Sequence, residues 1–393
     1  MCSHQSTLSG QVSFPISTGG VGMVKLIAAQ PIVRGVRLTF ENPSHEVELD
    51  ALWLRDHDQS SAGMDPVTGQ RRTDTMSLPD DLEVRATEIQ EDGKWIEVTW
   101  AEHLHTTRHE ANVLFTALDP DTARVPEPML WETPEQLGEL PTVQCEALAS
   151  DDGLRQLFGH MWRVGFCLVE STPATTEAIE KLVRRIGYPR VTVFGGMWTF
   201  GATGEYDDTA YSTVELPLHT DGTYAFDPPG WQVFHCVQYD GSGGLSTLAD
   251  GFAQVRAIQS ESADAFQTLC DVRVVGEYRG DGVHLRAAHP VVTRDDNERL
   301  VRVMYNNTDR AAFRRSDEEN TRFYNAYRRL GRRLLSPEIA LKYAMRPGTT
   351  LIVDNWRVLH GRTAFTGHRV LTGAYINRED VESCWRGLQA ADG

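Results

Sequence analysis

The stretches that decide how this chain is read are L-H-T-D-G at 218–222 and D-N-W-R-V-L-H-G-R at 354–362. They contain two imidazoles and one carboxylate, those of His219, Asp221 and His360. This ligand set, bound to one face of a metal, is typical of non-haem Fe(II) oxygenases, which keep adjacent positions open for a co-substrate and O2. An H-x-D pair alone is weak evidence, but here the distal histidine also follows a strand-like run of apolar and β-branched residues. We therefore predict a catalytic metal centre built from these three side chains.

A cation for the co-substrate stands shortly after the distal histidine, at Arg369. A guanidinium group binds carboxylates through two parallel hydrogen bonds, so Arg369 is expected to bind the far carboxylate of 2-oxoglutarate. Ser246 or Thr247, in the run G-G-L-S-T, is expected to add a hydroxyl partner. The alternative for Arg369 is a surface ion pair, and its spacing from His360 favours the anchoring role.

Composition excludes several classes of function. The chain has 393 residues with 38 Lys and Arg against 55 Asp and Glu, which gives a formal net charge of −17. Because this field repels phosphate backbones and no basic run is present, nucleic acid is not expected as a partner. No stretch reaches the roughly 18 apolar residues of a membrane span, and the first residues do not resemble a signal peptide. The 6 cysteines form no C-x-x-C pair. We read them as reduced thiols of a cytoplasmic protein without a membrane partner.

The chain is long enough for two domains. Short strands separated by turn residues predict a small β-rich N-terminal domain over 1–115, and a proline-rich stretch at 116–142 is the expected linker. The expected strands of the first domain are 36–40, 46–54, 82–89 and 95–100, with a hairpin turn at 91–93.

Beyond residue 143 many strand-like runs alternate with few helices. The expected strands are 165–169, 231–238, 245–249, 271–278, 300–305, 349–353 and 370–376, and the expected helices are 152–163, one from Thr172-Pro173 to Gly187, and 318–335. This pattern predicts a mainly β catalytic domain with flanking helices over 143–393, folded as a double-sheet jelly roll, the double-stranded β-helix. The metal ligands would meet at its mouth.

Several longer segments resemble the γ-butyrobetaine hydroxylase and trimethyllysine dioxygenase family, within the taurine dioxygenase superfamily that also holds trimethylammonium-alkylphosphonate hydroxylases. The segments are D-D-T-A-Y at 207–211, L-H-T-D-G-T-Y at 218–224, P-P-G-W-Q-V-F-H-C at 228–236, Y-N-N-T-D-R at 305–310, D-N-W-R-V-L-H-G-R at 354–362 and W-L-R-D at 53–56. The resemblance implies an Fe(II)- and 2-oxoglutarate-dependent dioxygenase that uses O2 to hydroxylate a small trimethylammonium compound. It also implies a homodimer, and ascorbate could stimulate turnover.

A quaternary ammonium group donates no hydrogen bonds, so ring faces and nearby negative charge must bind it. The family builds an aromatic cage for this purpose, and the matching positions here are Phe194, Trp198, Tyr211 and Tyr375. Phe194 replaces the tyrosine usual in the family, which keeps the ring and removes a hydroxyl. Asp208 is expected to face the cation. The alternatives are core packing for each ring and a solvated loop charge for Asp208.

The other end of the substrate is left open by the sequence. Asn306 and Asn307 could donate amide hydrogens to an anionic tail, whereas Arg310 could instead bridge strands. The tail could be a carboxylate, an amino acid or a phosphonate.

The resemblance also points to a difference in the N-terminal domain, where the family usually holds zinc through three cysteines and a histidine. Here His57 and Asp58 follow W-L-R-D, no cysteine lies between Cys2 and Cys145, and His105 alone matches a family ligand. Such residues make a poor tetrahedral zinc site, so we predict that structural zinc is lost.

Two other functions remain open at this point. The cage would also suit a hydroxylase or demethylase of methylated lysine in a peptide. A non-catalytic betaine-binding protein would keep the cage and lose the iron, and the intact ligand set tells against it.

Overall fold

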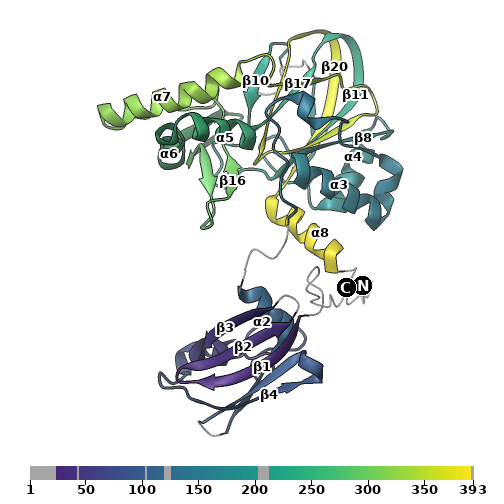
Figure 1. Cartoon of the computed structure of the whole chain (residues 1–393). Helices are drawn as coiled ribbons and strands as arrows, with labels where there is room; N and C mark the ends of the chain where they lie inside the picture. Colours follow the sequence, from purple (N-terminus) through teal and green to yellow (C-terminus); the bar gives the residue numbers. More distant parts are fainter. Residues whose placement is uncertain (1–23, 42–43, 102–103, 119–124, 202–211, 391–393) are drawn as a thin grey trace, which may run out of the picture. The chain divides into compact units, whose positions relative to one another are not determined.

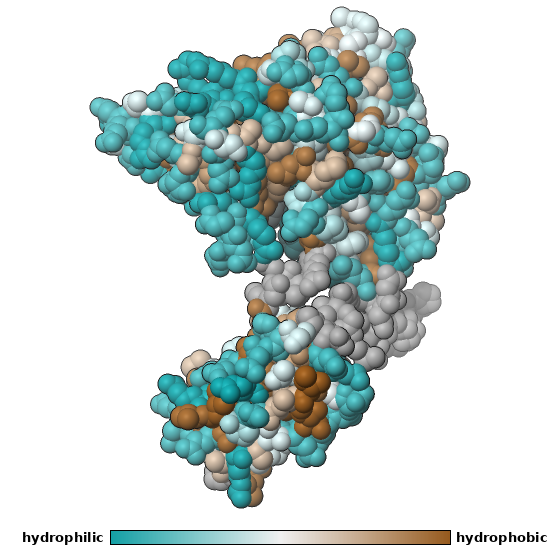
Figure 2. Space-filling view, in the orientation of Figure 1, coloured by the Kyte–Doolittle hydropathy of each residue, from teal (hydrophilic) through white to brown (hydrophobic). Residues whose placement is uncertain are grey.

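The chain forms two compact units, one of residues 1–124 with 389–393 and one of residues 125–388 (Figure 1). The computed structural model describes residues 24–41, 44–101, 104–118, 125–201 and 212–390. On the face of each unit shown in Figure 2 hydrophilic residues predominate, in line with a chain of which 24% is charged. None of the described helices is both long enough and apolar enough to cross a membrane.

The first unit has two three-stranded antiparallel sheets around one core. They consist of β1 (Lys25–Ile32), β2 (Gly35–Glu41) and β3 (His45–Asp50), and of β4 (Val84–Gln90), β5 (Trp95–Trp100) and β6 (Thr106–Glu110), with helices α1 (Ala51–Asp56) and α2 (Ala111–Leu118). Successive strand residues point to opposite faces, so β5 buries Ile96, Val98 and Trp100. The strand expected at 46–54 ends at Asp50, because the Asp50 carboxylate accepts from the backbone N–H groups of Leu52 and Trp53 and caps α1.

Hydrogen bonds hold the loop that follows α1. The buried Asp58 carboxylate accepts from the Ser60 N–H at 2.9 Å, the Ser60 hydroxyl at 2.8 Å and the Arg108 N–H at 3.1 Å. A carboxylate with these donors is well satisfied without a cation. The loss of structural zinc stays a prediction.

The second unit is mainly β with flanking helices, as expected. A six-stranded sheet has the order β7-β8-β18-β11-β20-β9, and a four-stranded sheet has the order β10-β19-β12-β17. Their bounds are β7 (Thr142–Gln144), β8 (Phe166–Glu170), β18 (Thr350–Asp354), β11 (Trp231–Gly243), β20 (Phe365–Ile376), β9 (Trp198–Phe200), β10 (Leu216–His219), β19 (Val358–Arg362), β12 (Ser246–Asp250) and β17 (Leu341–Tyr343). The two sheets share one apolar cluster, to which the larger contributes Leu168 and Leu351 and the smaller Leu248 and Val358. They therefore pack face to face.

Three helices cover the outer face of the larger sheet: α3 (Asp151–Val164), α4 (Thr176–Ile186) and α8 (Arg378–Ala390) (Figure 1). Both faces of this sheet are buried, because Leu168 faces the smaller sheet while Cys167 and Val169 face the helices. Helix α4 ends at Gly187 as predicted, but its N-cap is Thr175 and not Thr172. The Thr175 hydroxyl accepts from the Ala178 N–H.

A second group of helices was only partly expected. It comprises α5 (Gly251–Glu261), α6 (Ala263–Asp271) and α7 (Asp317–Leu334), which share a core with residues of the hairpins β13 (Arg273–Gly280) with β14 (Val283–Pro290) and β15 (Val292–Arg294) with β16 (Leu300–Val303). Helix α7 was predicted, and a capping box of Ser316 and Glu319 starts it. Helices α5 and α6 were not, and the strand expected at 271–278 begins only after α6 ends. Residues 251–255 are all buried, so the first turns of α5 lack the polar face that reveals a helix.

The proline-rich stretch expected as a linker belongs in part to the second unit, which begins at residue 125. Trp131 is fully buried there, and its ring N–H donates to the Val164 carbonyl at 2.9 Å. Its backbone N–H donates to Asp250 Oδ2 at 3.2 Å. Between residue 125 and β7 the only regular element is a short 3-10 helix at Pro134–Leu137, yet the stretch still packs against the second unit.

A buried ion pair fixes the turn between β18 and β19. Arg357 Nη2 lies 2.7 Å from Asp250 Oδ2, and the two side chains are 3% and 0% exposed. The remaining guanidinium donors bind the carbonyl oxygens of Trp162, Arg163 and Met129. Each charge is thus satisfied by the other and by the backbone that surrounds it.

We expect Arg357→Ala to lower the free energy of unfolding by about 3–5 kcal/mol, because it leaves the Asp250 carboxylate buried without its counter-charge. Urea denaturation measures this loss. Arg329→Ala, on the exposed surface of α7, is the control and should change stability by less than about 0.5 kcal/mol. Equal midpoints for the two variants would contradict the role given to the ion pair.

Candidate active site

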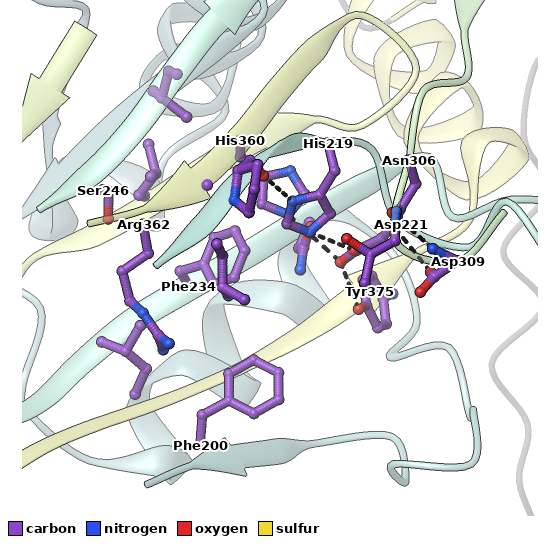
Figure 3. Close-up of a pocket in the computed structure, with 18 of the residues that line it drawn as sticks. Phe200, His219, Asp221, Phe234, Ser246, Asn306, Asp309, His360, Arg362 and Tyr375 are labelled. Atoms are coloured by element: carbon purple, nitrogen blue, oxygen red, sulfur yellow. Dashed lines mark hydrogen bonds and ion pairs between the residues drawn. The ribbon is translucent and has the colours of Figure 1, made fainter. Parts of the chain in front are cut away.

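Strand pairing brings the two predicted histidine ligands together. Strand β10 pairs with β19 so that His219 stands directly opposite His360, and their ring centroids are 4.6 Å apart. Asp221 follows just after the end of β10, and the possible ligand atoms of all three residues lie within 4.8 Å of one another (Figure 3). Residues far apart in the sequence therefore form one His-Asp-His group, as predicted.

The spacing of these atoms fits a metal ion. His219 Nε2 lies 3.2 Å from Asp221 Oδ1, and His360 Nε2 lies 3.6 Å from Asp221 Oδ2. Two ligand atoms about 2.1 Å from a metal and at right angles to each other are about 3 Å apart. His219 Nδ1 lies 2.7 Å from the Pro217 carbonyl oxygen, which can only accept. The proton on Nδ1 is thus held by this carbonyl, and Nε2, which faces Asp221, is the nitrogen directed toward a metal.

Electrostatics favour a cation between these groups. Burial by itself raises the pKa of Asp221, but the charges and hydrogen bonds of His360 and His219 hold that pKa well below its usual value. Burial lowers the pKa of His219, and the hydrogen bond and charge of Asp221 more than reverse this and raise it to about 9. For His360 burial dominates, and its pKa is lowered. A partly buried carboxylate of this kind favours positive charge beside it, and a divalent cation supplies it more fully than one proton.

The turn D-N-W-R at 354–357 holds the backbone at Asp221 in place. The Asn355 side chain, fully buried, accepts from the Asp221 N–H at 2.8 Å and donates to the Asp221 carbonyl at 3.0 Å. It also donates to the Pro229 carbonyl at 3.0 Å. One amide thereby ties the carboxylate ligand to the turn that leads into His360.

Tyr375 supports the carboxylate from the side, since its hydroxyl donates to Asp221 Oδ2 at 2.8 Å. Partners of this kind orient a ligand, and their loss typically costs about 10–100-fold in metal affinity. Tyr375→Phe should therefore weaken binding of Fe(II) or Mn(II) by about tenfold, as measured by anaerobic calorimetry, with the ring packing kept. Tyr324→Phe, on the outside of α7, should bind metal as the wild type does. Equal affinities for all three proteins would remove Tyr375 from this role.

The three ligands line a cavity of about 110 Å³. Its walls combine apolar and aromatic residues with a nearly equal share of polar and charged side chains. The apolar wall residues are Phe194, Phe200, Leu216, Phe234, Leu248, Leu351 and Leu371. Phe234 packs on the His360 ring at 5.3 Å between centroids. Phe234 limits water beside His360, which strengthens electrostatic interactions there.

Two guanidinium groups reach this cavity, where the sequence had indicated one. Arg369 lines it as expected, and among the described residues no carboxylate forms an ion pair with it. Arg362 also lines it and donates to the carbonyls of Ser212 at 2.7 Å and Val214 at 2.8 Å. Burial, with a smaller effect of the Arg369 charge, lowers the pKa of Arg362 to about 10. The two guanidinium groups place positive charge at this part of the cavity.

Of the two expected hydroxyl partners, only Ser246 lines the cavity. It stands opposite Arg362 in the ladder between β12 and β19. Thr247, opposite Gly361, does not line the cavity, because neighbouring residues of a strand point to opposite faces. The role of Thr247 stays a prediction, which its position off the cavity wall does not favour.

The expected cage residues are placed differently. Phe194 and Tyr375 line the cavity, whereas Trp198 does not. The Trp198 ring is 2% exposed and packs between Phe200 at 4.2 Å and Tyr375 at 5.9 Å, measured between ring centroids. Asp208 and Tyr211 lie outside the described residues. Tyr224, Phe200 and Phe234 also line the cavity and were not singled out as cage residues from the sequence.

Of the residues considered for the substrate tail, only some line the cavity. Asn306 lines the cavity, whereas Asn307 is exposed and lines a neighbouring hollow against α7. Arg310 does not reach the cavity: it bridges to Gly276 and lies over the rings of Tyr324 and Tyr327, which is the structural alternative. Asp309, which the sequence did not single out, does line the cavity.

Comparison with known proteins agrees with this geometry. The model of the family "Taurine catabolism dioxygenase TauD, TfdA family" matches residues 132–375. The chain belongs to this family. Human mitochondrial trimethyllysine dioxygenase is 36% identical over 356 residues, which cover 88% of this chain and 84% of that one. The enzyme of the same name from Gallus gallus gives the same identity and coverage. A γ-butyrobetaine dioxygenase from Pseudomonas sp. (strain AK-1) is 29% identical over 373 residues, covering 91% of this chain and 94% of that one. The resemblance found in the sequence is thereby confirmed, and the protein is an oxidoreductase of the dioxygenase class.

Proposed function

We propose that the protein is an Fe(II)- and 2-oxoglutarate-dependent dioxygenase that hydroxylates a C–H bond of a small trimethylammonium compound. The observation that carries this proposal is the His219, Asp221 and His360 group on the wall of a cavity that also receives two guanidinium groups and several aromatic rings. The names of the relatives support it, because they include a trimethyllysine and a γ-butyrobetaine dioxygenase.

The position of each side chain in the cavity suggests its role. His219, Asp221 and His360 would hold the ferrous ion on one face, which leaves adjacent positions for other ligands. The bound ion, with 2-oxoglutarate and O2, supplies the oxidising chemistry. Arg369 and Arg362 would bind the far carboxylate of 2-oxoglutarate by charge-assisted hydrogen bonds, and the Ser246 hydroxyl would complete that end of the cavity.

The remaining walls bind and orient the substrate. Phe194, Tyr224 and Tyr375 offer ring surface to a quaternary ammonium group, which no hydrogen bond can hold. Phe234, packed on the His360 ring, would exclude water beside the metal ligands, and Phe200 adds to the apolar part of the wall. The distance between these rings and the other end of the cavity then decides which carbon of the substrate lies near the metal.

Finer features of the fold and setting belong to the same proposal. The two face-to-face sheets would form the double-stranded β-helix of the family, with residues 1–115 as a separate β-rich domain. The homodimer and the cytoplasmic location stay predictions. The human relative is named as a mitochondrial enzyme, so that comparison does not support a cytoplasmic location for this chain.

A 2-oxoglutarate consumption screen tests the function. The purified protein with Fe(II) and ascorbate is given γ-butyrobetaine, free trimethyllysine or a trimethylammonium alkylphosphonate, each beside its dimethylamino analogue. At least one trimethylammonium compound should stimulate consumption and gain an oxygen atom, as seen by mass spectrometry, and its dimethyl analogue should do so more weakly. Failure of all trimethylammonium compounds in a protein that binds Fe(II) and 2-oxoglutarate would contradict the proposed substrate class.

A further inference from the structure

A buried amide lines the catalytic cavity from the larger sheet. Gln232 on β11 is 1% exposed, and it lines the cavity together with Phe234, which stands two residues later on the same face of the strand. In the part of the chain that the structure describes, the side-chain oxygen of Gln232 has no hydrogen-bond partner. A buried amide oxygen without a partner costs free energy, because it has lost its hydrogen bonds to water. The Gln232 amide is therefore suited to bind a ligand in the cavity.

Strand pairing places this amide at the metal end of the cavity. Gln232 stands directly opposite Tyr375 in the ladder between β11 and β20, so the two side chains start about 5 Å apart. Both line the cavity, and the Tyr375 hydroxyl donates to Asp221 Oδ2 at 2.8 Å. Arg369 lies toward the other end of β20, opposite Tyr239. The amide thus lies beside the metal ligands, away from the guanidinium groups.

The expected occupants of the cavity determine which hydrogen bond the amide makes. A trimethylammonium group has no donor, and 2-oxoglutarate has only carboxylate and keto oxygens, which accept. The amide of Gln232 carries two N–H donors beside its oxygen, and a half-turn about its last side-chain bond exchanges the two ends. It is therefore expected to donate. Its acceptor at the metal end is the carboxylate next to the keto group, because Arg369 is expected to bind the far one.

We infer that Gln232 is a further co-substrate-binding residue, whose amide donates a hydrogen bond to the 2-oxoglutarate carboxylate next to the keto group. The inference rests on the proposed function and adds a second point of attachment for the co-substrate, at the end remote from Arg369. A co-substrate held at both ends keeps one orientation in the cavity, and such orientation lowers the barrier to reaction.

Anaerobic calorimetry on the protein loaded with Fe(II) or Mn(II) measures the Kd of 2-oxoglutarate. Gln232→Met keeps the approximate size of the side chain and removes its hydrogen bonds, so Kd should rise by about tenfold, as for one hydrogen bond to a charged group. Gln232→Glu should bind more weakly still in mildly alkaline buffer, because its ionised carboxylate repels that of the co-substrate. Gln238→Met is the matched control, since Gln238 is exposed on the same strand, and its Kd should equal that of the wild type.

A purely structural role of the amide would not change two further quantities in this way. The affinity for the metal alone should be equal in the wild type and in Gln232→Met, because Gln232 is not a metal ligand. The visible charge-transfer band of the complex with Fe(II) and 2-oxoglutarate should move in energy in Gln232→Met, because the bound co-substrate has lost a hydrogen bond.

A Gln232→Met protein with the Kd and the band of the wild type would overturn the inference and leave the proposed function intact. Gln232→Glu binding as tightly as the wild type would overturn it too, since the amide oxygen would then be an acceptor. A Gln232→Met protein that fails to fold would assign the amide to the fold instead. A wild type that binds the metal but not 2-oxoglutarate would overturn the proposed function together with the inference.

Discussion

Replacement of His360 or Asp221 by alanine is expected to abolish substrate-stimulated consumption of 2-oxoglutarate. Each change leaves two metal ligands of three. Mutation of a residue that only hydrogen-bonds to a metal ligand typically lowers metal affinity or activity by about 10–100-fold. Removal of a ligand itself should therefore lower activity by more than about 100-fold. In the described part of the chain His360 Nδ1 has no hydrogen-bond partner, so His360→Ala breaks no such bond at that atom. Turnover and bound Fe(II) per chain should fall together.

His368→Ala is the matched control, since His368 is an exposed histidine on β20, the next strand along the chain. It should keep both turnover and bound iron. Retained turnover in both ligand variants would remove His360 and Asp221 from the metal centre.

Arg369→Ala should raise KM for 2-oxoglutarate by about 100-fold, because a bidentate contact contributes two charge-assisted hydrogen bonds. Arg369→Lys should recover only part of this loss, since an ammonium group cannot bind a carboxylate through a planar fork. At saturating 2-oxoglutarate, kcat should be affected far less than KM. Initial rates over a range of 2-oxoglutarate concentrations give both constants.

Arg346→Ala serves as the control for loss of a cation nearby, because Arg346 is exposed and stacks on Tyr239 outside the cavity. Its KM should match the wild type. An unchanged KM in Arg369→Ala would show that Arg362 or another group binds the co-substrate alone.

The metal ligands could be predicted because their chemistry needs certain residue types, and two strand ends bring them together. The same reasoning could also have identified Arg362. It stands two residues after His360, and alternate residues of a strand share a face, so the spacing H-G-R puts Arg362 on the same face of β19 as His360. To choose between Ser246 and Thr247, one must know which residues of β12 face the cavity. The pairing of β12 with β19 decides this, and the residue types alone do not reveal it.

Other features depend on packing that a single sequence does not contain. Trp198 has the right residue type for a cage, but it fills the space beside Phe200 and Tyr375. Trp131 lies in a proline-rich stretch that looks like a linker, yet a buried ring and two hydrogen bonds tie it to the second unit. Asp309 was passed over because an aspartate in a turn is most often a local cap, and only the cavity shows where it faces.

The most direct test of the central claim is an anaerobic absorbance titration of the protein with Fe(II) and 2-oxoglutarate. If His219, Asp221 and His360 hold the iron while 2-oxoglutarate chelates it, a weak visible charge-transfer band should appear only when both are present. The band should saturate at one iron per chain and be absent from His360→Ala. No band in a wild-type protein that remains folded, or an equal band in His360→Ala, would contradict the account.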